Sequence, residues 1–143
     1  MSVTVKKITV WRGEVDNRAG ALARVLEPLR AVRGSLDLVM GYRIPGLHER
    51  AVIEVWPVSG KRVAQAAEAA GLRPSETPTL LVMGDDRPGL GHAMARALAD
   101  AGINMVFLVA QVIGRRYSAA FGFESAADVD RAAGLLKKVK PAK

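Results

Sequence analysis

Residues that could bind a small charged molecule are concentrated between Gly84 and Met105. This stretch opens with Gly-Asp-Asp-Arg-Pro-Gly-Leu-Gly-His, continues as a helical pattern and ends in Ala-Gly-Ile-Asn-Met. Free N–H groups at the start of a helix bind anions such as a carboxylate, while Gly89 and Gly91 let a ligand approach the backbone closely. The amide of Asn104 offers both a donor and an acceptor. The pattern is consistent with a small-molecule site, although a capped helix in an ordinary connection explains the same residues.

The elements that would position these residues are a strand, a helix and a second strand. Apolar Thr79–Met83 predicts the first strand, and we expect Asp85 and Asp86 to end it and to cap the helix that follows. The helix has one apolar face, formed by Leu90, Ala93, Met94, Ala97, Leu98 and Ala101. If the strand that begins at Met105 lies beside the first strand, the loop and Asn104 come to the same end of the sheet.

No pattern in the chain predicts catalysis or metal binding. The sequence has no cysteine, and His48 and His92 show no metal-ligand spacing with carboxylates. The Gly-Leu-Gly-His segment lacks the lysine of a phosphate-binding loop, and no serine follows the pattern of a nucleophile elbow. We therefore expect no catalytic residue, no metal and no cofactor.

Composition indicates a small globular protein. The 143 residues are half hydrophobic, which is enough for one or two small domains. The N-terminus lacks an apolar signal core, and no apolar run reaches membrane-spanning length, so we expect a cytoplasmic protein without membrane contact. The net charge is +7, but the basic residues are scattered, except at Lys137, Lys138, Lys140 and Lys143. Such a tail complements the dipole of a last helix, so the charge does not favour a nucleic-acid partner.

The order of predicted elements occurs twice. The first half reads as strand, helix, strand, strand and helix, over Val3–Trp11, Leu22–Leu29 with Pro28 inside it, Leu36–Tyr42, Arg50–Trp56 and Val63–Ala70. The second half repeats this order over Thr79–Met83, Gly89–Ala101, Asn104–Val112, Tyr117–Phe123 and a helix that Ser125 caps.

The repeat is also visible in the residues of one loop. Asn17-Arg18-Ala19-Gly20 in the first half matches Asp86-Arg87-Pro88-Gly89 in the second. Two copies of one module are therefore predicted, over residues 1–73 and 74–143. The expected fold class is α+β, with antiparallel sheets that carry the helices on one face.

Two strands of the second half indicate a further packing surface. Both alternating sets of side chains in Asn104–Val112 are apolar, and a strand that is apolar on both faces is buried on both faces. Tyr117–Phe123 has a similar composition. We interpret this as packing of one sheet against another in a homodimer, with packing of the two modules face to face within one chain as the alternative.

The loop and the following strand resemble a known family. Asp86-Arg87-Pro88-Gly89 after a strand, followed by Ala101-Gly102-Ile103-Asn104-Met105, resembles the ACT domain, a regulatory module that binds amino acids. The segment Pro74–Gly91 resembles the junction of stand-alone tandem ACT proteins. The resemblance covers nearly the whole chain and implies a ferredoxin-like βαββαβ fold in each module. It also implies that an amino acid binds at an interface between modules.

The resemblance assigns ligand-binding positions in both modules. In the second module it implies a loop formed by Asp86, Arg87, Gly89 and Leu90, facing Asn104 and Met105 of a neighbouring strand. In the first module Asn17, Arg18, Gly20 and Leu22 occupy the corresponding loop. The first module departs from the family pattern, because Ala19 replaces the loop proline and Ser35 or Leu36 stands where the asparagine is expected.

The sequence thus predicts a non-enzymatic regulatory protein that binds a small amino acid between ACT-like modules. One alternative is a structural ACT pair that docks on a biosynthetic enzyme as its regulatory subunit. A second is an RNA-binding module, because Arg115–Phe123 distantly resembles the aromatic strand of RNA-recognition domains. The spacing of its aromatic residues departs from that motif.

Overall fold

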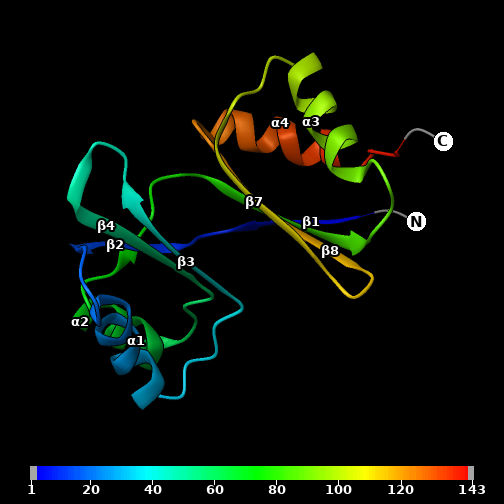
Figure 1. Cartoon of the computed structure of the whole chain (residues 1–143). Helices are drawn as coiled ribbons and strands as arrows, with labels where there is room; N and C mark the ends of the chain where they lie inside the picture. Colours follow the sequence, from blue (N-terminus) through cyan, green and yellow to red (C-terminus); the bar gives the residue numbers. More distant parts are fainter. Residues whose placement is uncertain (1–2, 142–143) are drawn as a thin grey trace. The chain divides into compact units, whose positions relative to one another are not determined.

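The computed structural model describes residues 3–141, which fold into two units that are interleaved along the chain (Figure 1). One unit is the continuous segment Thr9–Ser75, here called the inserted unit. The other, here called the outer unit, joins the strand that ends at Ile8 to the chain from Glu76 onward. Each unit contains a four-stranded antiparallel sheet and two helices.

The inserted unit is a complete βαββαβ module. Its elements are β2 (Trp11–Asp16), α1 (Ala21–Ala31), β3 (Leu38–Ile44), β4 (Leu47–Trp56), α2 (Lys61–Ala69) and β5 (Arg73–Pro74). The strand order across the sheet is β3-β4-β2-β5. A proline inside a helix is expected to bend or interrupt it. Helix α1 nevertheless continues through Pro28 to Ala31, and Pro28 lies within its last turn.

The outer unit has the same arrangement but takes its last strand from the N-terminal end of the chain. Its elements are β1 (Thr4–Ile8), β6 (Thr79–Asp85), α3 (Leu90–Asp100), β7 (Met105–Ile113), β8 (Arg116–Phe123) and α4 (Ala126–Leu136). The strand order is β1-β6-β8-β7, so β1 occupies the place that β5 has in the inserted unit. As predicted, the fold is α+β with two ferredoxin-like antiparallel sheets, and Ser125 caps α4 by accepting from Asp128 N–H at 3.1 Å.

The first predicted strand is two strands in different sheets. Thr4–Ile8 pairs with β6, whereas Trp11–Asp16 pairs with β4 and β5. The prediction of one strand over Val3–Trp11 was wrong because alternation of side chains does not show where a strand changes its partner. The structural units accordingly differ from the predicted residue ranges in the placement of the stretch up to Ile8.

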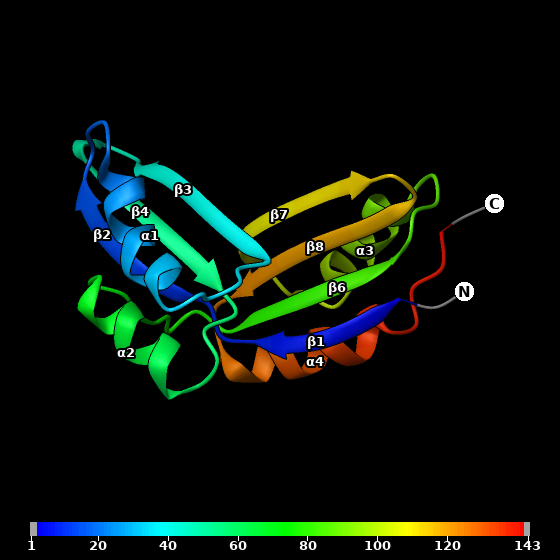
Figure 2. The same cartoon turned by 90° about the horizontal axis from the view of Figure 1, so that it is seen from below.

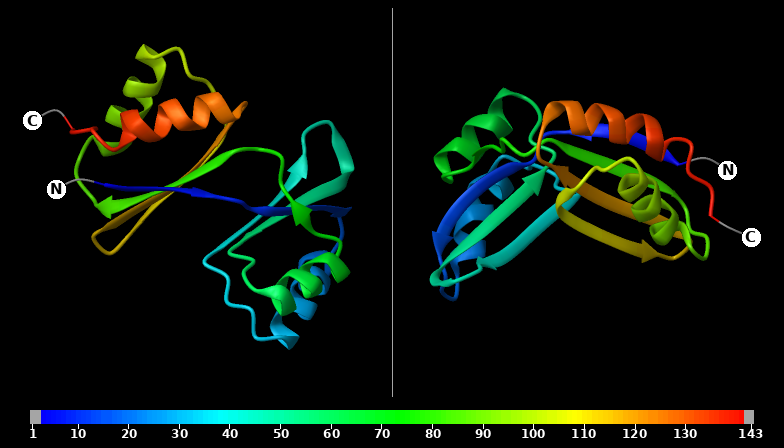
Figure 3. Two further views of the ribbon diagram at one scale, coloured as in Figure 1. Left: turned by 180° about the vertical axis from the view of Figure 1, so that it is seen from behind. Right: turned by 90° about the horizontal axis from the view of Figure 1, so that it is seen from above.

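Each unit has its own hydrophobic core between its helices and one face of its sheet (Figures 2 and 3). In the outer unit Tyr117, Phe121 and Phe123 lie in this core and are at most 7% exposed. Their interpretation as a dimer surface was wrong. They line the helix-covered face of β8, and the apolar faces of α3 and α4 are sufficient to bury them.

Strand β7 is an exposed edge strand. It pairs only with β8 within the described residues, and five of its large apolar side chains are exposed, from 38% for Val109 to 70% for Ile113. The prediction that this strand is buried on both faces therefore does not hold within a single chain. Among residues 3–141, no helix combines the length and apolar character needed to cross a membrane.

Candidate ligand-binding site

The loop between β2 and α1 in the inserted unit and the loop between β6 and α3 in the outer unit end in the same backbone conformation. Gly20 precedes α1 with φ 89° and ψ −10°, and Gly89 precedes α3 with φ 85° and ψ 0°. This left-handed conformation favours glycine, which explains why the repeat retains a glycine at both places. No side chain caps either helix, so the predicted capping by Asp85 or Asp86 was wrong. The first N–H of each helix donates within the loop, from Ala21 to Arg18 O at 3.2 Å and from Leu90 to Arg87 O at 3.1 Å, which leaves the next N–H groups of the first turn for other acceptors.

An ion pair joins the last residue of the strand before each loop to the neighbouring strand. Asp85 Oδ1 lies 2.9 Å from Arg116 Nη1, and Asp16 Oδ1 lies 2.7 Å from Arg50 Nη1. In both sheets the two residues are opposite each other on neighbouring strands. The sequence alone did not predict this repeated ion pair, because its two members are 31 residues apart in the outer unit and 34 in the inserted unit. The aspartate before each repeated loop is the signal that could have shown it.

In the outer unit the space beside the start of α3 is filled. Leu90 is 3% exposed and Tyr117 is 7% exposed. The Tyr117 hydroxyl lies 3.8 Å from the position that a Cβ atom would take on Gly91. Asp86 donates its N–H to Arg115 O at 2.7 Å, while the side chains of Asp86 and Arg87 are exposed. Burial raises the pKa of Tyr117, and the negative charge of Asp86 raises it further.

This raised pKa predicts that stability falls at high pH. An unfolded tyrosine ionises near pH ~10, and the folded outer unit holds Tyr117 neutral above that value. The contribution of Tyr117 is complete below the unfolded pKa and is lost as pH rises through the higher folded pKa. Unfolding by urea at a series of pH values should show that the free energy of unfolding falls at high pH. Tyr117→Phe should remove the part of this fall that comes from ionisation of Tyr117. An ultraviolet titration in which Tyr117→Phe removes a tyrosine of ordinary pKa would contradict the expectation.

In the inserted unit the corresponding space is open. The Asn17 amide donates to His48 O at 2.8 Å, and the Asn17 N–H donates to Glu49 O at 2.9 Å, which fixes the loop on the β3–β4 hairpin. Asn17, Arg18 and Leu22 line a cavity of about 300 Å³ beside the first turn of α1. Gly20 sets the backbone of this loop but does not line the cavity.

Asn104 and Met105 lie at the other end of the outer unit's sheet from the Asp86–Gly89 loop. Strands β6 and β7 are both antiparallel to β8 and do not touch each other. Met105 is paired with Phe123, whereas Asp85 and Ile113 both pair with Arg116 at the opposite end of β8. At roughly 3.4 Å per residue, the strand places Asn104 about 25–30 Å from the loop. The expectation that they share one end of this sheet was wrong, because β8 separates the two strands and leaves them parallel.

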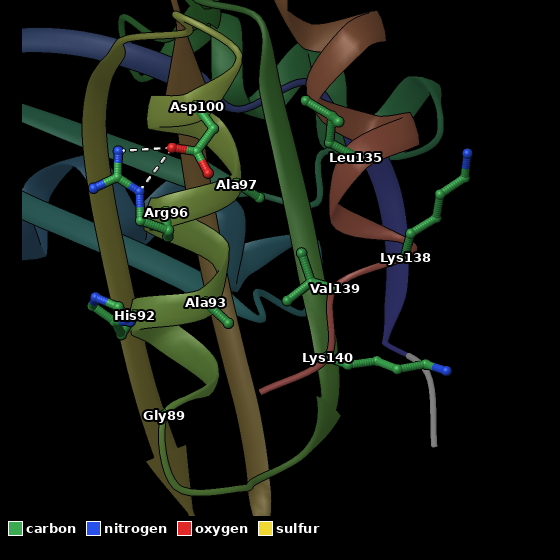
Figure 4. Close-up of a pocket in the computed structure, with 10 residues that line it drawn as sticks. All are labelled: Gly89, His92, Ala93, Arg96, Ala97, Asp100, Leu135, Lys138, Val139 and Lys140. Carbon is green, nitrogen blue, oxygen red and sulfur yellow. Dashed lines mark hydrogen bonds and ion pairs between the residues drawn. The ribbon is translucent and has the colours of Figure 1, made fainter. Parts of the chain in front are cut away.

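A second open groove follows the outer surface of α3 and the segment after α4 (Figure 4). Its volume is about 470 Å³, and Gly89 is its only contact with the predicted loops. The Arg96 side chain extends away from Leu135 and Val139 (Figure 4) and pairs with Asp100 one turn further along α3, at 2.8 Å. Lys138 and Lys140 lie at its border. Within residues 3–141 no group of three or more histidine or acidic side chains is placed to hold a metal ion.

The chain is similar in structure to several solved proteins of low sequence identity. A protein from Bacteroides thetaiotaomicron superposes with a TM-score of 0.75 at 12% identity, over 96% of this chain and 93% of that one. The aspartokinase alpha and beta subunits give 0.62 at 14% identity, over 96% of each chain. The regulatory subunit of aspartate kinase from Thermus thermophilus gives 0.58 at 19%, over 95% and 97%. No protein-family model and no curated protein sequence matches the chain. These similarities show that the chain shares the fold of these proteins.

Proposed function

We propose that this protein is a non-enzymatic regulatory protein that binds a small amino acid at the loops that begin α1 and α3. The observation that carries the proposal is the duplicated loop, in which a left-handed glycine precedes a helix that no side chain caps. N–H groups in the first turn of a helix that lack an acceptor in the protein can donate hydrogen bonds to a carboxylate. The likeness of the fold to the regulatory subunit of aspartate kinase from Thermus thermophilus supports a regulatory role.

The proposed ligand contacts come from two copies of the chain. Asp86, Arg87, Gly89 and Leu90 belong to the loop, but Asn104 and Met105 are a strand length away in the same unit. A second copy is therefore needed to place the Asn104 amide opposite the loop. The uncovered apolar side chains of β7, which begins directly after Asn104, supply a surface for that homodimer.

A second candidate function is regulation of an enzyme through the same exposed strand. The aspartokinase comparison concerns a protein of alpha and beta subunits, and β7 could equally be covered by an enzyme chain. The structure does not favour the RNA-binding alternative. Base stacking needs aromatic side chains on an open sheet face, whereas Phe121 and Phe123 are buried beneath helices.

The proposal predicts a ligand among the twenty amino acids and a defined effect of Asn104→Ala. A binding amino acid at 100 times its dissociation constant should stabilise the fold by about 2.7 kcal/mol in a thermal-shift screen. Asn104→Ala should then weaken binding by about 1–3 kcal/mol, because the ligand loses a hydrogen bond and keeps an unpaired polar group.

The matched control is Gln111→Ala, which removes an exposed amide from β7, near the end of that strand that is far from Asn104. We expect it to leave the affinity unchanged. A screen in which no amino acid binds would overturn the proposed function. An amino acid that binds Asn104→Ala as tightly as wild type would instead remove Asn104 from the site.

A further inference from the structure

The inserted unit contains a cavity at a place that large buried side chains occupy in the outer unit. Its volume is about 300 Å³, and it lies between the first turn of α1 and strands β3 and β4. Residues of the inserted unit alone line it. The apolar part is formed by Val15, Ala21, Leu22, Ala51 and Ile53, with Gly41 opening one side.

The internal repeat explains why this place is open in the inserted unit and filled in the outer unit. The Asp–Arg ion pairs and the left-handed glycines fix the correspondence between the two modules. Ala21 and Leu90 each follow the glycine, and Ala51 and Tyr117 each follow the arginine. In the outer unit the two large side chains, Leu90 and Tyr117, are buried in the core. In the inserted unit both positions hold alanine, and the corresponding space is the cavity.

At a third pair of corresponding positions the larger side chain is in the inserted unit. Leu22 corresponds to Gly91, the residue over which the Tyr117 hydroxyl lies in the outer unit. The large residue is therefore on the sheet in the outer unit and on the helix in the inserted unit. Leu22 is 43% exposed at the edge of the cavity, so it borders the space without filling it.

The polar border of the cavity is cationic. Arg18 and Arg43 line it and are exposed, and the guanidinium group of neither makes an ion pair or hydrogen bond in the described part of the chain. The acidic neighbour Asp16 is already paired with Arg50. Guanidinium groups bind carboxylates through paired hydrogen bonds, and the uncapped start of α1 favours the same charge.

We propose that this cavity of the inserted unit binds a small carboxylic acid with an aliphatic side chain. The apolar floor would hold the side chain, while Arg18, Arg43 and the start of α1 would hold the carboxylate. A volume of about 300 Å³ is at the lower end of small-molecule pockets, which fits a compact acid. The inference rests on the proposed function only in taking the acid to be an amino acid. It places the ligand within one unit, away from Asn104.

The test measures binding by calorimetry with leucine, isoleucine and valine, with the α-keto acid of leucine, and with isoamylamine as the probe without a carboxylate. At least one aliphatic amino acid should bind, and isoamylamine should not. The double variant Leu22→Gly/Ala51→Tyr reproduces the glycine and tyrosine of the outer unit and should fill the cavity. We expect it to weaken binding of the amino acid at least about tenfold.

A second variant tests the inference without altering the packing. Arg43→Gln removes a charge that has no partner in the described structure, and it should weaken carboxylate binding about tenfold. Arg62→Gln, an exposed residue of α2 outside the cavity, is the matched control and should change nothing. Circular dichroism melting checks that each variant is folded.

The outcomes separate the two proposals. If leucine, isoleucine and valine bind and lose affinity in Arg43→Gln and in the folded double variant, both proposals are supported. If these amino acids bind wild type and both variants equally well while Asn104→Ala abolishes binding, the cavity inference is overturned and the proposed function stands. If only the α-keto acid binds, and binds in the cavity, the cavity stands as a carboxylate site, and the screen of all twenty amino acids decides the proposed function. If none of the acids binds wild type, the cavity inference is overturned, and the screen of all twenty amino acids decides the proposed function.

Discussion

Replacing Phe121 by alanine should lower the free energy of unfolding of the outer unit by about 3–5 kcal/mol. Phe121 is 1% exposed on the helix-covered face of β8, and its ring stacks on Phe123 with centroids 6.2 Å apart and planes inclined by 9°. The substitution removes a large apolar group and leaves a cavity that the packed neighbours fill only in part. Denaturation by urea should show a lower midpoint with an unchanged slope.

The control for this variant is Val109→Ala on strand β7. Val109 is 38% exposed, so its truncation should change the stability of the monomeric chain by about 0.5 kcal/mol or less. The comparison also distinguishes a core residue from an interface residue. A core substitution costs the same at every protein concentration, whereas an interface substitution costs nothing once the chain is diluted to monomers. If the loss in Phe121→Ala disappears on dilution, Phe121 belongs to an interface and its placement in the core is wrong.

The type and order of most elements could be predicted because they depend on local patterns. Leu90, Met94 and Leu98 recur at helical spacing, and these are the buried residues of α3. The glycine that begins each first helix is required by its left-handed backbone, so the repeated loop was visible in the residues themselves. The duplicated order of strands and helices then led to two antiparallel sheets with helices on one face.

The partners of strands could not be predicted in the same way. Lys7 and Arg12 belong to neighbouring strands of the sequence that lie in different sheets, and nothing local marks the change. The prediction of where Asn104 lies failed for a related reason. Its distance from the Asp86 loop depends on β8 lying between β6 and β7, which is a property of the topology rather than of either segment.

The candidate cavity could not be predicted from the sequence either, although the residues that line it are all in the sequence. Alanine is common in cores, so Ala21 and Ala51 indicate a space only when the neighbouring elements are known. The informative comparison was with Leu90 and Tyr117 at the corresponding places of the second module. That comparison requires the Asp–Arg pairs as reference points, because the two hairpins differ in length. The loop residue Leu22 was predicted as a site residue and does border the cavity, but whether it contacts a ligand stays a prediction.

Val109→Lys should convert the proposed homodimer into monomers, with the dimer dissociation constant raised about a hundredfold or more. Val109 lies at the middle of β7, between Val106 and Val112, which are 55% and 47% exposed. A lysine on an edge strand prevents another strand from pairing there, because its charge would have to leave water. Sedimentation velocity over a range of protein concentrations measures the change.

The matched control places the same charge on an exposed helix surface. Ala99→Lys on α3 alters the net charge equally but lies away from the β7 edge, so it should leave the dimer intact. A wild-type chain that is monomeric at every concentration, or a Val109→Lys variant that dimerises normally, would contradict the assignment of this strand. The variant also separates the two proposed binding modes. A ligand that needs Asn104 from a second copy should lose affinity when the dimer dissociates, whereas a ligand held in the cavity of the inserted unit should bind the monomer equally well.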